Sequence, residues 1–174
     1  EKHGKSIASV RAGNVIGGGD WALDRIIPDC IRALESNKPI EIRNPKAIRP
    51  WQHVLEPLSG YMLLASKMWD EPTKYCEGWN FGPRAESITS VWKVATKVIE
   101  NYNNRGELRD ISDPDALHEA RLLMLDISKA KFLLGWEPRM NINQCVALTI
   151  DWYKGYKQNS IYELCLNEIS TFLV

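Results

Sequence analysis

The sequence predicts an α/β protein with parallel strands, because predicted strands alternate with predicted helices along the chain. Residues 7–16 are mostly apolar, which is typical of a strand inside a sheet. Residues 22–36 repeat their apolar side chains at helical spacing. Four strands are expected in all, too few for a doubly wound sheet. The chain therefore resembles the second half of a larger fold.

The first half of the chain contains a helix, a short strand and a second helix. The helix over residues 22–36 contains Pro28, which fits only in a first turn, so the helix is expected to begin nearer Ile27. Residues 39–43 alternate apolar and polar side chains like a short strand. A long apolar helix is predicted from about residue 55 to residue 69.

The next elements are a strand, a helix and a loop. Residues 79–83 form a short strand that Gly-Pro closes. Ser87 or Thr89 is expected to cap a helix that runs to about Tyr102. Residues 103–115 are polar and are expected to form a loop.

The last third of the chain begins with a predicted short strand over residues 122–125. Asp126 can cap a short helix, which stops at Gly135. Either Asn141 or Asn143 begins a last amphipathic helix. No element is predicted beyond that helix.

Composition and charge narrow the class of protein. Lys and Arg together number 22, as do Asp and Glu, so the formal net charge is zero and no basic excess favours a nucleic-acid partner. No apolar run approaches the roughly 20 residues of a membrane span. The four cysteines lie far apart, as expected for reduced thiols in a cytoplasmic protein. The three histidines show no metal-ligand spacing, so no metal site is expected.

The stretch around the three glycines at 17–19 is a candidate anion site. Asn14 stands at the carboxyl end of the first strand, where ligands of parallel sheets bind. Glycines allow backbone N–H groups to come close to an anion, and the helix behind adds its positive end. A flexible turn without a ligand explains the same glycines equally well.

Two further candidate anion-binding positions are arginines. Arg49, fixed beside a proline and Trp51, has the geometry of a diphosphate clamp, or else lies on the surface over Trp51. Arg121, beside the expected strand at 122–125, can reach an anion or serve as a surface or capping residue. His53 is interpreted as structural.

Two sequence patterns of dehydrogenases are considered and not assigned a role: a Y-x-x-x-K pair that is interpreted as coincidental, and a glycine fingerprint that is incomplete. Tyr153 and Lys157 spell Y-x-x-x-K, the pair by which short-chain dehydrogenases take a proton from a substrate, but the pair falls late in an amphipathic helix and this spacing arises readily by chance. The glycines near the first strand form neither G-x-x-G-x-x-G nor G-x-G-x-x-G, so a complete dinucleotide fingerprint is absent.

The order of several motifs resembles a known family. They are R-x-x-N-x-x-G, D-R-I-I-P-D, P-I-E-I, R-P-W-Q-H-V, W-N-F-G-P and L-D-I-S-K-A-K-x-x-L-G-W-E-P. This succession is similar to the C-terminal half of the extended short-chain dehydrogenases/reductases that modify nucleotide sugars. The detailed versions look most like the CDP-glucose 4,6-dehydratases. The resemblance covers nearly the whole chain and thins after Lys157.

The resemblance implies a Rossmann-type fold in two parts. Residues 1–16 and 50–83 would be the last strands and a helix of the parallel Rossmann sheet. Residues 17–49 and 84–158 would form a small α+β nucleotide-sugar-binding domain. Residues 159–174 would be a C-terminal tail.

The resemblance also implies roles for individual residues. Asn14 and Arg49 would bind the diphosphate, and His118 and Arg121 would close over it from the other side. The residues expected at the substrate are Asn14, Asp24, Arg25, Ile26, Pro39, Ile40, Glu41, Ile42, Arg49, His118 and Arg121. Within that set, the segment 24–26 would lie along the nucleotide, and the backbone of residues 39–42 would read the edge of its base.

This chain departs from the family pattern at one position, and two of its residues are expected near the cofactor. In the related dTDP-type pattern an arginine stands three residues before the histidine, but this chain has Asp115 there, so Arg121 would have to replace it. Arg11 and Ala12 would approach the nicotinamide end of NAD. No residue of this chain is expected to be catalytic.

The implied reaction is the loss of water from CDP-glucose or a related nucleotide sugar with bound NAD, which gives a 4-keto-6-deoxy sugar. The glycine loop for NAD and the catalytic Y-x-x-x-K would precede the strand at 7–16, so this chain is expected to be inactive alone. The full enzyme would be a homodimer. Because one edge of the strand at 7–16 would lack its neighbours, the isolated chain is expected to self-associate.

Two other readings stay open. One is a relative with different chemistry, such as an epimerase or a dehydratase for another nucleotide. The other is a non-catalytic module that binds a nucleotide sugar or a partner protein. The sequence does not rank the nucleotides, because backbone contacts along residues 39–42 carry no readable base preference.

Overall fold

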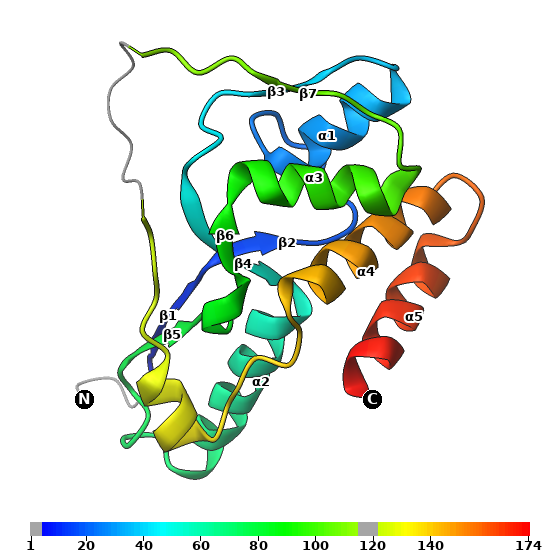
Figure 1. Cartoon of the computed structure of the whole chain (residues 1–174). Coiled ribbons are helices and arrows are strands. Elements are labelled where there is room, and N and C mark those ends of the chain that lie inside the picture. Colours follow the sequence, from blue (N-terminus) through cyan, green and yellow to red (C-terminus); the bar gives the residue numbers. More distant parts are fainter. Residues whose placement is uncertain (1–4, 115–121) are drawn as a thin grey trace.

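The computed structural model describes residues 5–114 and 122–174. Strands and helices alternate through most of the chain, as predicted, and Figure 1 shows them in chain order from blue to red. The strands are β1 (Ser9–Ala12), β2 (Asn14–Ile16), β3 (Ile40–Ile42), β4 (Ile48–His53), β5 (Gly78–Phe81), β6 (Ile88–Ser90) and β7 (Leu108–Asp110). The helices are α1 (Ile26–Glu35), α2 (Leu55–Asp70), α3 (Val91–Tyr102), α4 (Ile142–Gly155) and α5 (Ile161–Leu173), with short helical turns η1 (Ala85–Ser87) and η2 (Ala130–Leu134).

The first predicted strand is divided into β1 and β2, which pair on opposite sides. β1 pairs in parallel with β5, and β2 pairs in parallel with β4. Gly13 stands at the crossing, where its N–H donates to the carbonyl oxygen of Phe81 at 3.2 Å. A Cβ at Gly13 would lie 2.3 Å from the carbonyl oxygen of Pro50, so only glycine fits there.

Residues 7–16 are expected to form an apolar strand with one edge left open in this chain, and within the described residues the structure leaves an open edge on both β1 and β2. Val10 of β1 is 40% exposed and Val15 of β2 is 41% exposed. Among the described residues each half of the strand has one neighbour, β5 or β4, and its other edge is open. The apolar side chains on these edges are the physical basis for the expected self-association, which stays a prediction.

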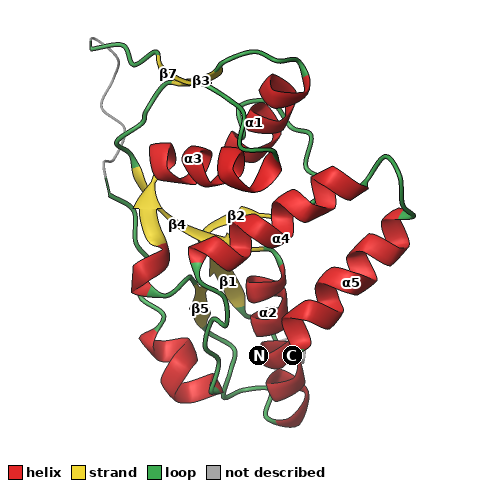
Figure 2. Ribbon diagram, turned by 45° about the vertical axis from the view of Figure 1, so that its right-hand side comes forward, coloured by secondary structure: helices red, strands yellow, loops and turns green. Residues whose placement is uncertain are grey.

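Two apolar cores hold the molecule together. The first joins α1, α3 and α4 to β3 and β4, and it includes Ile31, Val94 and Val146, each fully buried. The second joins α2, β5 and η2 around Phe81 and Trp136. Figure 2 shows α4 crossing beside α3, with α5 lying alongside at the edge of the molecule.

Most of the predicted helices lie where they were expected. α1 begins at Ile26, so Pro28 falls in its first turn, and α2 covers the predicted range to within one residue. Asp126 Oδ1 accepts from the N–H of Ser128 at 2.8 Å, and Gly135 ends the helical turn with φ +72°. The amide side chain that caps α4 belongs to Asn141.

Four local expectations are corrected. The cap of α3 is Ser90, because residues 88–90 extend as β6 antiparallel to β4 before the helix begins. The expected loop at 103–115 contains β7, which pairs in parallel with β3. The expected strand at 122–125 is reduced to one bridge between Leu122 and Ile48. Residues that followed the last predicted helix form α5.

Candidate functional site

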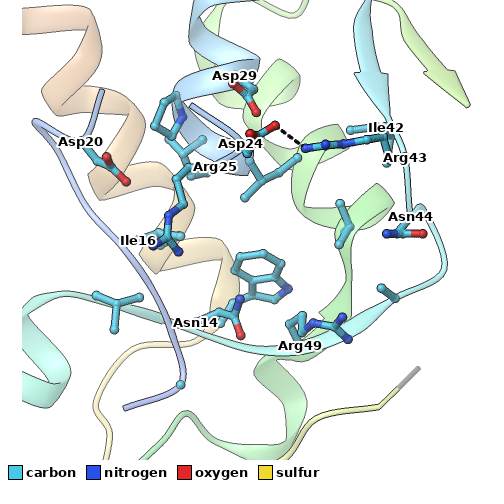
Figure 3. Close-up of a pocket in the computed structure, with 18 of the residues that line it drawn as sticks. Asn14, Ile16, Asp20, Asp24, Arg25, Asp29, Ile42, Arg43, Asn44 and Arg49 are labelled. Atoms are coloured by element: carbon cyan, nitrogen blue, oxygen red, sulfur yellow. Dashed lines mark hydrogen bonds and ion pairs between the residues drawn. The ribbon is translucent and has the colours of Figure 1, made fainter. Parts of the chain in front are cut away.

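A cavity of about 790 Å³ lies between the glycine-rich turn, the start of α1, β3 and β4. Seven of the residues expected at the substrate line it, and they come from four separate segments. They are Asn14, Asp24, Arg25, Ile26, Glu41, Ile42 and Arg49. Figure 3 shows most of them facing a common space. The volume falls within the roughly 300–1,000 Å³ of ordinary small-molecule sites.

One side of the cavity is built by two paired strands. In the β2–β4 register Asn14 is the partner of Trp51, which places Asn14 and Arg49 on neighbouring strands. Both side chains are half-buried and lie along the same edge of the view in Figure 3. Arg49 Nη1 donates to the carbonyl oxygen of Ile48 at 3.0 Å, which orients the guanidinium. Trp51 is 5% exposed and lines the cavity together with Arg49.

The N-terminus of α1 forms another wall. Its N-cap residue, Arg25, makes no side-chain cap, so the N–H groups of Ile26 and Ile27 at the cavity are not satisfied by a capping side chain. Pro28, the third residue, has no N–H. Two N–H groups and the positive end of a helix therefore face a cavity beside the Arg25 guanidinium, an arrangement that favours an anion.

The charged side chains that line the cavity are not evenly mixed: paired acidic and basic groups lie at one end, and Arg49 lies at the other. The lining contains three arginines and four carboxylates, so the cavity as a whole is not positive. Asp29 pairs with Arg32, and Asp24 pairs with Arg43 at 2.5 Å. In Figure 3 the Asp24–Arg43 pair lies on the side opposite Asn14 and Arg49. An anion therefore fits near Asn14, Arg25 and Arg49.

The glycine-rich turn has a packing role that the sequence did not reveal. Gly17 lines the cavity, but a Cβ at Gly18 would lie 2.1 Å from the ring of Trp152. Gly19 adopts φ +80° over the same ring. Close packing on the indole thus explains Gly18, and the positive φ explains Gly19. Gly17 lines the cavity, and a Cβ there would lie 2.8 Å from Cγ1 of Val54.

The Y-x-x-x-K pattern is structural. The Tyr153 hydroxyl donates to the carbonyl oxygen of Asp20 at 2.5 Å, and this bond holds the turn to α4. Burial raises the pKa of Tyr153 to about 12, with a further contribution from Asp20. Lys157 pairs with Glu35 at 2.7 Å. A phenol that resists deprotonation, with its lysine engaged elsewhere, does not form an acid–base pair.

Several expected residues lie outside the cavity. Ile40 is in the core and Pro39 lines a separate hollow of about 310 Å³. His118 and Arg121 lie outside the described residues. His53 is fully buried, and its Nδ1 accepts from the N–H of Leu55 at 3.4 Å, a structural position.

The expected cofactor residues, Arg11 and Ala12, are on β1 and do not line the cavity. The 174 residues contain no dinucleotide fingerprint. The residues present therefore do not form an NAD site by themselves. No group of three or more metal-ligating side chains was found among residues 5–114 and 122–174.

Sequence reasoning missed four polar lining residues, Asp20, Asp29, Arg43 and Asn44. Arg43 and Asn44 directly follow the strand whose backbone was expected to read the base. Their position just beyond the carboxyl end of β3 is the signal that could have indicated them. No helix of the described part is long and apolar enough to cross a membrane.

Comparison with known proteins identifies relatives of this chain. No protein-family model matches it. The CDP-glucose 4,6-dehydratase of Salmonella typhimurium is 45% identical over 174 residues, which are 99% of this chain and 48% of that protein. The chain thus spans about half the length of this curated relative and corresponds to its C-terminal portion.

Solved structures show the same fold. The dTDP-glucose 4,6-dehydratase of Bacillus anthracis, solved with NAD, superposes with a TM-score of 0.69 at 18% identity over 87% of this chain and 45% of its own. The UDP-glucuronic acid 4-epimerase of Bacillus cereus, solved with UDP-glucuronic acid and NAD, superposes with a TM-score of 0.71. Its identity to this chain is 18%, over 87% of this chain and 46% of its own. The expected resemblance and fold class are confirmed: the chain is homologous to the C-terminal portion of a CDP-glucose 4,6-dehydratase, with the fold of the extended short-chain dehydrogenases/reductases.

Proposed function

We propose, from the homology to the C-terminal portion of CDP-glucose 4,6-dehydratase, that this chain is the nucleotide-sugar-binding portion of such an enzyme. The observation that carries the proposal is that seven residues expected from the family motifs, from four separate segments, line one cavity. The diphosphate would lie near Asn14, Arg25 and Arg49, with the N-terminus of α1 beside it.

The reaction proposed for the complete enzyme is the conversion of CDP-glucose to its 4-keto-6-deoxy product, a lyase reaction with NAD as cofactor. The NAD complex of the related Bacillus anthracis dehydratase supports this cofactor. Because the 174 residues contain neither the glycine fingerprint nor a functional Y-x-x-x-K pair, they are proposed to bind substrate and to lack activity alone. A homodimeric, cytoplasmic enzyme is proposed on the family resemblance.

A second candidate is an epimerase or a dehydratase for another nucleotide. The UDP-glucuronic acid 4-epimerase shares the fold with a TM-score of 0.71, so the fold does not separate the two reactions. Identity of 45% to a CDP-glucose enzyme favours the first candidate. A non-catalytic module that binds a nucleotide sugar would share the cavity but would have no activity in the full-length protein.

Calorimetric titration of CDP into the purified chain, with circular dichroism to establish folding, tests the proposal. Arg49→Gln and Arg25→Gln should each weaken CDP binding roughly tenfold or more, because each removes a charged hydrogen-bond donor from the diphosphate. Arg109→Gln is the control, since Arg109 is an exposed arginine that pairs with Glu107 outside the cavity. Folded chain that binds no CDP, or binding that neither cavity variant alters, would contradict the proposal.

A further inference from the structure

The Asp24–Arg43 ion pair lies at the end of the cavity away from Asn14 and Arg49 (Figure 3). Asp24 belongs to the loop before α1, and Arg43 is the first residue after β3. The pair joins Nη2 of Arg43 to Oδ1 of Asp24 at 2.5 Å. Oδ2 of the carboxylate and the other guanidinium N–H groups make no further hydrogen bond within the described part of the chain.

Stability does not account for this pair. The side chains are 74% and 65% exposed, and exposed ion pairs contribute little to folding because water and salt screen them. Asp24 also adopts φ +60°, a left-handed conformation that aspartate tolerates better than most residues but that still costs it energy relative to glycine. Asn37 and Asn104 share a positive φ, but each follows the end of a helix, where this conformation is common. Asp24 is therefore held at the cavity in an unfavourable conformation, as functional residues often are.

The surroundings of the pair suit a flat ring. Ile26, Ile42 and Val91 line the same cavity and provide apolar surface. A nucleotide with its diphosphate near Asn14, Arg25 and Arg49 would extend its base toward the opposite end, where the ion pair presents an acceptor and donors side by side. A base that offers a donor next to acceptors matches that pattern.

We propose that Asp24 and Arg43 select cytosine over uracil and thymine, an inference that rests on the proposed function. The Asp24 carboxylate would accept from the exocyclic amine of cytosine, a pairing that carboxylates make with this base. Arg43 would donate to the neighbouring ring nitrogen and carbonyl oxygen. Uracil and thymine place a carbonyl oxygen where cytosine has its amine, so the carboxylate would oppose that oxygen. Selectivity for cytosine thus comes from the attraction between the Asp24 carboxylate and the cytosine amine, and from the repulsion between that carboxylate and the carbonyl oxygen of uracil or thymine.

The proposal assigns the reading of the base to side chains. The family resemblance implies that backbone groups of residues 39–42 read it; within that segment Ile40 is buried in the core and Pro39 lines another hollow. Glu41 and Ile42 remain at the cavity and lead directly to Arg43. A carboxylate distinguishes an amine from a carbonyl oxygen, whereas a strand backbone offers both a donor and an acceptor.

The test measures CDP and UDP affinity of the purified chain by calorimetry. The parent chain should bind CDP at least roughly tenfold more tightly than UDP, the discrimination expected of one good base contact. Asp24→Asn should lower CDP affinity and bring the two affinities to within about threefold of each other, because the amide can donate to the uracil oxygen. Asp24→Gly, which suits the positive φ, should lose discrimination while keeping or raising the unfolding temperature.

Glu107→Gln is the matched control, because Glu107 belongs to an exposed ion pair with Arg109 outside the cavity and should keep the CDP preference. If CDP and UDP bind the parent chain equally, or if both Asp24 variants keep the preference, the proposal is wrong while the proposed function stands. If no nucleotide binds the folded chain, the proposed function fails and the assignment of Asp24 and Arg43 fails with it.

Discussion

Trp152 supports the turn that borders the cavity. Its ring lies against Gly18 and Gly19 and stacks on Tyr156, with ring centroids 5.8 Å apart and an interplanar angle of 1°. Tyr153 adds its hydrogen bond to Asp20. At the scale of single residues, the aromatic side chains of α4 thus hold the segment that carries Gly17 and Asn14 into the cavity.

Gly18→Ala should destabilise the chain by about 1–3 kcal/mol, because a methyl group 2.1 Å from the buried ring of Trp152 forces the turn or the ring to move. Chemical denaturation measures the change. Gly78→Ala is the control, since a Cβ there meets only Ser9 Oγ, at 3.4 Å, and little change is expected. Equal stability of the Gly18 variant and the parent would show that the turn does not pack on Trp152.

Glu56 is a buried carboxyl group on α2 that ties two segments together. Its Oε1 accepts from the N–H of Arg139 at 2.8 Å and from that of Met140 at 2.6 Å. Its Oε2 has no partner among the described residues. Burial raises the pKa of Glu56 above its ordinary value of 4.5, and the two backbone N–H groups oppose that shift.

Stability should therefore depend on pH through this residue. Because the folded chain holds the Glu56 proton at a pH where the unfolded chain has lost it, the stabilisation is complete below the unfolded pKa of about 4.5 and is lost as the pH rises through the higher folded pKa. Glu56→Gln should gain stability relative to the parent as the pH rises above about 4.5. Denaturation across pH 4 to 8, with the exposed Glu100→Gln as control, measures this difference. If the difference in stability between Glu56→Gln and the parent did not change with pH, a raised pKa of Glu56 would be refuted.

At the scale of elements, helices were predicted better than strands. The four predicted long helices carry apolar residues at helical spacing over ten or more positions, a signal strong enough to locate α1, α2, α3 and α4. β6 and β7 have three residues each, too few for a pattern of alternation. β4 contains Pro50, which argues against a strand in sequence, and its neighbours β2 and β6 become visible only in the fold.

The cap of α4 gives an element-scale prediction. Asn141 Oδ1 accepts from the N–H groups of Asn143 and Gln144, and Gln144 Oε1 accepts from the N–H of Asn141 at 2.9 Å. Asn141→Ala should cost about 1 kcal/mol of stability, the ordinary value of an N-cap. Asn143→Ala, within the helix, should be neutral or stabilising because alanine favours helix. Urea denaturation of both variants decides between the two asparagines; a larger loss at Asn143 would contradict the assigned cap.

At the scale of the whole molecule, the cavity lies where elements distant in sequence meet. Family motifs indicated Asn14, Arg25 and Arg49, but their convergence required the β2–β4 pairing and the position of α1. Arg43 directly follows β3, which is the signal that could have indicated it, whereas nothing in the sequence marks Asp29, in the first turn of α1, as a cavity residue. The same limit applies to Pro39 and Ile40, which neighbour the site in sequence and face elsewhere.

Nuclear magnetic resonance of the labelled chain titrated with CDP-glucose would locate the ligand. Shifts are expected at Asn14, Gly17 and the first turn of α1, and at residues 41–44, all of which line the large cavity. The second hollow, of about 540 Å³ beside Lys46, Trp92 and Lys93, should stay unchanged and serves as the internal control. Shifts confined to that hollow, or no shifts from a folded chain, would contradict a nucleotide-sugar site between β2, β4 and α1.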